Sequence, residues 1–266
     1  MIRDITIGQY YRADSVLHRL DPRVKLVATL LFIISIFAFP DVKGMLIAVC
    51  FLVGAIALSR VPLNFIVKGL KPVFFFICFT LVLNLFMVDG EVAVRIWKLT
   101  ITWEGIKSAV QVGVRLVMLI IGSSVMTLTT TPNQLTDGIE SLLGPLRYIR
   151  VPVHEVAMMM SIALRFIPIL LEETDKIMKA QTARCADFES GNIVRRAKNM
   201  VPILVPLLMS AFRRANDLAM AMEARCYRGG EGRTKMKPLH YHKIDIAAYG
   251  VVLIYYGINI TLKILA

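Results

Sequence analysis

Reactive and metal-binding side chains are scarce in this chain of 266 residues. There are four cysteines and four histidines. Cys50 and Cys78 lie within apolar stretches, whereas Cys185 and Cys226 lie in a later, more polar segment. Disulfide-stapled folds need several cysteines at close spacing in a short chain. The sequence therefore predicts no disulfide framework.

Motifs for ATP hydrolysis and for zinc catalysis are also missing. No segment matches Gly-x-x-x-x-Gly-Lys-Ser/Thr, so we expect no ATP binding by that route. His154-Glu155 begins like a zinc-protease motif, but Met158 stands where the second histidine is needed on the same helical face. We therefore expect no catalytic residue, no metal site and no cofactor in this chain, and do not expect it to be an enzyme.

Apolar residues, by contrast, are abundant and gathered in long runs. They make up 56% of the chain, and the mean hydropathy is +0.64. This pattern predicts an all-α, polytopic membrane protein rather than a soluble domain. A helix needs about 20 residues to cross the hydrocarbon core, and several runs are shorter, so the number of spans is about five. The predicted spans are residues 26–39, 44–58, 73–88, 109–128 and 246–265.

Acidic residues are fewer than basic ones, and the excess is concentrated. The chain has 31 Lys and Arg against 19 Asp and Glu, and 17 of those basic residues lie in residues 130–243 against 11 acidic ones. Basic loops remain on the cytoplasmic side, so this segment and the amino terminus are predicted inside. Topology and anionic lipids explain the charge, and no nucleic-acid partner is expected.

Residues 130–243 are too apolar for a plain linker and predict a helical domain. It should begin with a short amphipathic helix at 133–143 and continue with two long helices that cross, joined by a turn at 187–191. Small alanines in the second long helix would permit a close crossing. The predicted regions are 1–129 with four spans, 130–243 as a cytoplasmic coupling domain, and 244–266 as the last span. The predicted seam of the second helix is Leu204, Leu208, Ala211, Ala215, Leu218 and Met222.

One charged residue, Arg115, falls inside the fourth apolar run. An unpaired charge at the centre of a bilayer costs about 2.5 to 3.5 kcal/mol on insertion scales. We therefore expect Arg115 either to reach toward an interface or to pair inside the helix bundle, and assign it no transport role.

The tripeptide Ala-Arg-Cys occurs twice, each time at the predicted end of a long helix. Arginine offers a permanent charge and a planar fork of donors, and a preceding alanine lets another backbone come close. Two such ends indicate a docking device for other proteins. The alternative is a pair of ordinary solvated helix ends, each with a cation near the negative end of the helix dipole. The residues concerned are Ala183, Arg184, Cys185, Ala224, Arg225 and Cys226.

Methionine is frequent in residues 158–222, which hold eight of the fourteen in the chain. Methionine packs adaptably, so a methionine-rich platform could receive several related apolar partners. A structural filler role is an equal alternative. The candidate contact residues are Met158, Met159, Met160, Met209, Met220 and Met222.

Three segments together resemble a known family. They are 15–25 (SVLHRLDPRVK), 162–168 (IALRFIP) followed by Glu172-Glu173, and 180–184 (AQTAR). In combination these residues are similar to the transmembrane T component of energy-coupling factor vitamin transporters, and the similarity runs over nearly the whole chain.

The resemblance implies a scaffold subunit of an ATP-driven importer in the plasma membrane of a prokaryote. Its partners would be two ATP-binding subunits of the EcfA and EcfA′ type, the lipid bilayer, and one S component that captures the vitamin. Arg184 with Ala183 would dock one ATPase, and Arg225 with Ala224 the other. Family members commonly have glycine after the arginine, whereas this chain has Cys185 and Cys226.

Two further classes of protein remain as alternatives. A self-sufficient secondary transporter or channel would need paired polar residues within the spans or matching broken helices in two halves. A membrane enzyme would need acid, histidine or metal-ligand clusters at the membrane face. A scaffold should co-purify with ATPases, whereas a carrier or an enzyme should be active alone.

Overall fold

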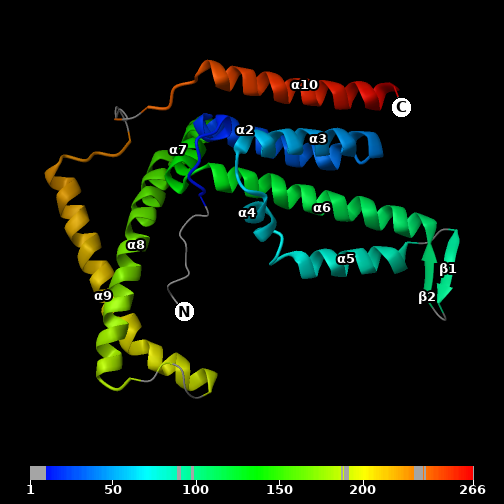
Figure 1. The fold of residues 1–266 in the computed structure, drawn as a ribbon. Helices are drawn as coiled ribbons and strands as arrows, with labels where there is room; N and C mark the ends of the chain where they lie inside the picture. The colour runs from blue at the N-terminus through cyan, green and yellow to red at the C-terminus, as the bar shows by residue number, and fades with distance from the viewer. Residues whose placement is uncertain are drawn as a thin grey trace. The chain divides into compact units, whose positions relative to one another are not determined.

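Helices make up nearly all of the regular structure in the computed structural model, which describes residues 10–88, 91–96, 99–186, 188, 192–230, 236 and 238–265. The predicted all-helical class is confirmed, with one addition: a short antiparallel hairpin of β1 (Val92–Ile96) and β2 (Leu99–Thr102) that we did not predict. The helices, shown in Figure 1, are α1 (Val16–Arg19), α2 (Pro22–Ala38), α3 (Val42–Ser59), α4 (Leu63–Lys68), α5 (Phe74–Met87), α6 (Trp103–Thr129), α7 (Pro132–Leu142), the 3-10 helix η1 (Gly144–Ile149), α8 (Val153–Ala183), α9 (Ile193–Ala224) and α10 (Lys243–Leu265).

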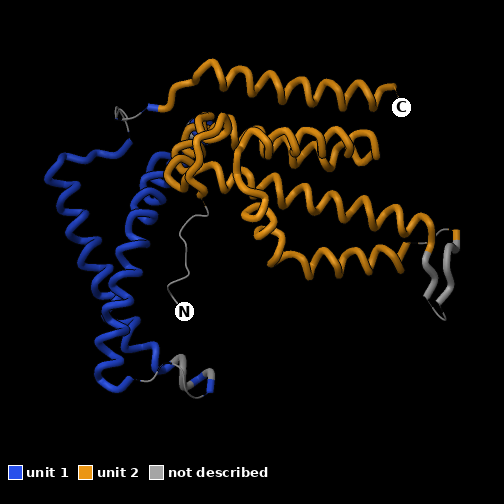
Figure 2. The backbone as a smooth tube through the Cα atoms, in the orientation of Figure 1, with its two compact units in different colours: residues 1–7, 143–238 blue, residues 8–142, 239–266 orange. Residues whose placement is uncertain are grey.

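The chain divides into two compact units (Figure 2). We call residues 8–142 with 239–266 the span unit, and residues 143–238 the long-helix unit; residues 1–7 group with the latter but lie outside the described residues. The division falls after α7, not at residue 130. The reason is local packing: a Cβ atom at Gly138 of α7 would come within 3.1 Å of Leu26 in α2.

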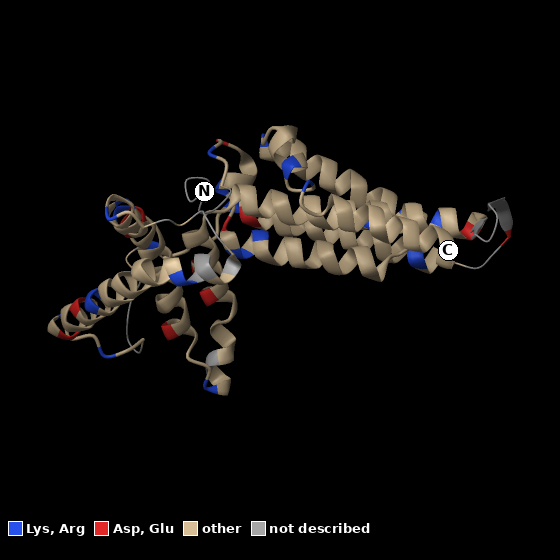
Figure 3. Cartoon of the chain, turned by 90° about the horizontal axis from the view of Figure 1, so that it is seen from below, with Lys and Arg blue, Asp and Glu red and all other residues tan. Residues whose placement is uncertain are grey.

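All five predicted spans form helices, namely α2, α3, α5, α6 and α10. Among the described helices, α3, α6, α8 and α10 are long and apolar enough to cross a membrane by length and composition. α2 has 17 residues and α5 has 14, so each is shorter than about 20. In the span unit, charged residues are sparse along the middle of the helices (Figure 3). The chain is thus a polytopic helical membrane protein.

α8 is long and apolar enough to cross a membrane, although we predicted it outside the membrane. Its first part is apolar, while its last part carries charges. The expected turn at 187–191 lies, apart from residue 188, outside the described residues.

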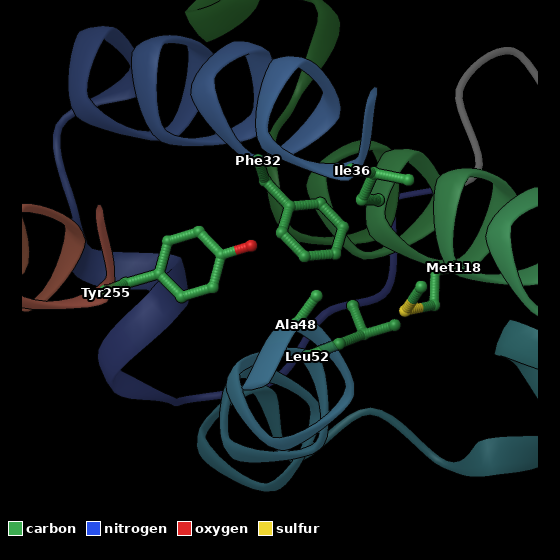
Figure 4. Packing of buried hydrophobic residues seen from close by; sticks show 6 residues of the cluster. All are labelled: Phe32, Ile36, Ala48, Leu52, Met118 and Tyr255. Atoms are coloured by element: carbon green, nitrogen blue, oxygen red, sulfur yellow. The ribbon is translucent and has the colours of Figure 1, made fainter. Parts of the chain in front are cut away.

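The core of the span unit packs α10, near the end of the sequence, against α2, α3 and α6 from its first half. A tight cluster forms where α2, α3, α6 and α10 meet (Figure 4). Gly122 lets α6 approach closely, because a Cβ atom there would lie 2.7 Å from the ring of Phe32. The hydroxyls of Ser35 and Tyr255 lie 2.6 Å apart, which joins α2 to α10 by a buried hydrogen bond. The cluster consists of Phe32, Ile36, Ala48, Leu52, Met118 and Tyr255.

Arg115 lies half-buried on α6. Its guanidinium carbon is 5.8 Å from the centre of the Phe37 ring on α2, within the range of a cation–π contact. Of the two expectations, the structure therefore favours a partner inside the bundle, and this partner is aromatic rather than acidic.

The face of α9 that meets α8 differs from the predicted seam. Leu204 and Leu208 are 57% and 55% exposed, and Ala215 is also exposed, so their assignment to the seam was wrong. α9 is apolar on two sides, and periodicity alone does not reveal which side packs. Among the described side chains of α9, the buried or partly buried ones are Asn199, Ile203, Leu207, Ser210, Ala211, Arg214, Leu218 and Met222, of which three were predicted.

Candidate docking site at the ends of the long helices

Both long helices end in the same backbone motif. After α8, the N–H of Ala186 donates to the carbonyl of Gln181 at 3.0 Å, and that of Cys185 donates to Thr182 at 3.0 Å. After α9, the N–H of Tyr227 donates to Met222 at 3.0 Å, and that of Cys226 donates to Glu223 at 2.8 Å. This pair of bonds is the Schellman motif.

The repeated triplets thus occupy equivalent places in the two motifs. Arg184 and Arg225 are the cap residues, and the following Cys185 and Cys226 have left-handed backbones, with φ of 63° and 55°. The side chains of both triplets, alanines included, are exposed in the single chain. Two arginines are therefore presented to the surroundings by the same local geometry, one per long helix.

Cysteine is unfavourable at these left-handed positions because its Cβ atom approaches the following carbonyl, at a cost of roughly 1 to 2 kcal/mol. We predict that Cys185→Gly and Cys226→Gly each stabilise a helix end by about 1 kcal/mol, which slows amide exchange of Ala186 or Tyr227 about fivefold. Hydrogen–deuterium exchange measures this directly. Cys50→Gly, inside α3, should change local exchange in the opposite direction, because glycine weakens a helix interior. Unchanged protection at both ends would contradict the assigned geometry.

An ion pair holds α8 and α9 together where they cross. The Nη2 atom of Arg214 donates to Oε2 of Glu173 at 2.6 Å. This hydrogen bond, with the nearby positive charge, holds the pKa of Glu173 below its usual value although partial desolvation opposes it. The carboxylate therefore stays charged at neutral pH. Glu173 was noted in the sequence only as part of the family resemblance, and Arg214 was not noted, because their partnership depends on the crossing.

A second contact lies closer to the Arg184 end. The side-chain amide of Gln181 donates to the carbonyl of Pro202 at 3.4 Å. In a regular helix this carbonyl would accept from the N–H of residue 206, but residue 206 is a proline and has no N–H. Gln181 thus supplies the bond that the proline removes, and it ties the end of α8 to α9.

The crossing lies at the same sequence distance from each arginine. Arg184 follows Glu173 by eleven residues, and Arg225 follows Arg214 by eleven. At a rise of 1.5 Å per residue, each arm is about 16 Å long. The two arms have equal length on either side of one ion pair.

The two arginines lie at opposite ends of the helix pair rather than together. Gly230, just after α9, packs on His154 at the start of α8, since a Cβ atom at Gly230 would come within 2.5 Å of that ring. The helices are therefore antiparallel, and Arg225 lies toward the start of α8 whereas Arg184 follows its end. Any partners at the two ends must be separate, or one partner must be large.

The predicted methionines are distributed along the same pair. Met159, Met160, Met209 and Met220 are 38% to 60% exposed, while Met158 and Met222 are partly buried. A further exposed apolar surface is a stripe on α9, of which Leu204 and Leu208 were predicted in the seam and Met209 was predicted as a contact residue. We call it the α9 stripe, and it consists of Val201, Leu204, Val205, Leu208, Met209 and Phe212, each between 50% and 60% exposed.

Comparison with known proteins identifies the family. Residues 13–236 match the family model described as cobalt transport protein. The chain is 53% identical over 258 residues to the energy-coupling factor transporter transmembrane protein EcfT of Heliobacterium modesticaldum, covering 96% of this chain and 97% of the relative. The EcfT proteins of Clostridium kluyveri (54% over 266 residues, 99% and 98% covered) and Bacillus subtilis (48% over 240 residues, 90% and 91% covered) are also similar. The chain therefore belongs to the family of energy-coupling factor transporter transmembrane proteins and is the T component of such a transporter.

Proposed function

We propose that this chain couples ATP hydrolysis by two cytoplasmic ATPase subunits to the release of a vitamin from a separate membrane subunit. The observation that carries the proposal is the pair of equivalent exposed arginine caps at opposite ends of two crossed helices. Each arginine can enter an acidic or carbonyl-lined groove and form bidentate hydrogen bonds there. The subunit itself performs no catalysis in this scheme.

The crossed helices act as two levers about the Glu173–Arg214 ion pair. When ATP draws the two ATPases together, the docked arginines approach each other. Because the arms are of equal length, this motion turns α8 and α9 by similar amounts in opposite directions. The result is a scissoring that changes the surface offered to the vitamin-binding subunit.

The α9 stripe and the exposed methionines are the proposed contact surface for that subunit. Large contiguous apolar patches on a protein usually mark contacts with other proteins or with membranes. Methionine adapts to partners of different shape, which suits a scaffold that serves several S components. The choice of vitamin then lies with the S component.

The proposed location is the plasma membrane of a prokaryote, with the amino terminus and the long-helix unit in the cytoplasm. The basic excess in residues 130–243 supports this orientation. A docking role also requires it, since ATP and the ATPases are cytoplasmic.

The direct test is the composition and activity of the purified assembly. We expect the chain, co-expressed with the ATP-binding and S subunits of its own transporter, to purify as a complex with two ATPase chains and one S component. Reconstituted vesicles should import vitamin only when ATP is present on the ATPase side. Gradient-driven uptake by the chain alone would instead identify a secondary transporter or channel, and turnover of a substrate by the chain alone would identify an enzyme.

A further inference from the structure

The segment Ser15–Lys25 remains unexplained by docking, although it is one of the most distinctive in the sequence. In the structure its polar side chains, apart from the exposed Arg19, form a connected and largely buried hydrogen-bond network in the span unit. Asp21 and Lys25 are each 6% exposed, and Asp245, which accepts from the backbone of Asp21, is 0% exposed.

Asp245 joins the starts of two helices. Its Oδ1 atom accepts from the backbone N–H of Asp21, the cap residue of α2, at 2.8 Å. Its Oδ2 atom accepts from the N–H of His242, just before α10, at 2.7 Å. A carboxylate between two helix amino termini is favoured by both helix dipoles. One side chain therefore fixes the start of α10 on the start of α2.

Lys25 joins the start of α2 to the end of α6. Its Nζ atom donates to the carbonyl of Thr129, the last residue of α6, at 2.8 Å and to that of His18 at 3.4 Å. The N–H of Tyr11 donates to the carbonyl of Leu128 at 2.9 Å. The His18 ring reaches back to the Tyr11 carbonyl through Nε2 at 2.9 Å. The segment before α2 is thus bonded to the end of α6.

Arg23 holds the chain just before α10. Its guanidinium donates to the carbonyl of Leu239 at 3.2 Å and lies 5.0 Å from the centre of the Tyr241 ring. On another side, Pro22 and Leu26 pack against Gly138 of α7. The start of α2 therefore contacts α7, the end of α6 and residues 239–245.

These contacts coincide with the two internal junctions between the units. The chain enters the long-helix unit after residue 142 and leaves it before residue 239. The Ser15–Lys25 segment holds the chain on the span-unit side of both junctions. We infer that this segment is a coupling clamp: it fixes both chain connections to the spans, so that scissoring of α8 and α9 acts on the S component instead of loosening α6 and α10. Lys25 of the segment and Asp245 of α10 are the positioning residues of this clamp.

This inference rests on the proposed function, and the test separates the two. Lys25→Met keeps the length of the side chain but removes the donor to Thr129. Asp245→Asn keeps the shape, but its amide oxygen can serve only one of the two N–H groups. Lys71→Met, at an exposed lysine of the same unit, is the matched control.

Each variant is assembled into the full transporter with its ATPases and S component and placed in lipid vesicles. We expect Lys25→Met and Asp245→Asn to leave ATPase docking affinity within twofold of wild type. Vitamin imported per ATP hydrolysed should fall at least fivefold. Amide exchange in residues 10–21 and 239–246 should rise at least fivefold in both variants and stay unchanged in Lys71→Met.

Faster exchange at these segments with a wild-type import ratio would overturn the coupling role, and unchanged exchange in both variants would overturn the clamp itself. Failure of the wild-type chain to bind ATPases would refute the proposed function, while the exchange measurements would still decide whether the clamp exists.

Discussion

Replacing Arg184 and Arg225 together by alanine is expected to abolish ATPase docking and ATP-driven uptake while the chain still folds and inserts. Both side chains are exposed in the single chain, so folding does not depend on them. A docked arginine at the centre of an interface is typically worth about 2 kcal/mol or more, which is about 30-fold in affinity for each site. Binding of purified ATPase subunits to the chain in nanodiscs measures the loss.

Two control variants distinguish docking through the arginine guanidinium groups from non-specific attraction by positive charge. Lys179→Ala with Arg213→Ala removes two exposed basic residues from the same two helices and should change affinity less than threefold. Arg184→Lys keeps the charge but loses bidentate geometry, so it should weaken docking at one end only. Equal losses for the two double variants would show that docking is non-specific, and no loss in the arginine double variant would exclude the docking role.

The second large effect is expected at the α9 stripe. Leu208 is 55% exposed near the middle of this surface, and Leu208→Asp places a charge there. Burying an unpaired carboxylate against an apolar partner costs several kcal/mol, so binding of the S component should fall at least 30-fold. ATPase docking should stay within twofold, because the substitution lies away from both arginine caps. Co-purification of the S component, quantified by mass spectrometry, measures the change.

The matched control for this prediction is Asn216→Asp, which adds the same charge at an exposed position of α9 outside the stripe. It should retain the S component. If Leu208→Asp also retains it at wild-type affinity, the α9 stripe contacts lipid or another surface, and the proposed S-component site must be moved.

The helices were predictable because each apolar run has its own composition and length. The five predicted spans and the short helix before Gly144 all form as helices. The hairpin of β1 and β2 was missed, since its two strands are short and give little periodic signal. The seam of α9 was misplaced for a different reason. Periodicity finds an apolar face, but the polar Ser210 and Arg214 face α8 because Glu173 bonds to them, and this pairing depends on the crossing.

The residues of the candidate site could be predicted from the sequence, but their backbone conformation could not. The repeat of Ala-Arg-Cys pointed to two helix ends, yet sequence rules place glycine, not cysteine, at a left-handed cap. Cys185 and Cys226 both adopt that conformation. The roles of Gln181 and Lys25 could not be read from the sequence either, because their partners Pro202 and Thr129 lie 21 and 104 residues away.

The same two cysteines offer the most direct measurement of docking. Cys185 and Cys226 are exposed and follow the proposed docking arginines. Cys50 and Cys78 lie in apolar helices, which a hydrophilic maleimide should not reach from water. Chains that retain one of the two thiols, through Cys185→Ala or Cys226→Ala, report each end separately. Docking predicts rapid labelling of the free chain and at least tenfold slower labelling of both ends once the two ATPases are bound. Labelling of both thiols at the free-chain rate within the assembled transporter would contradict it.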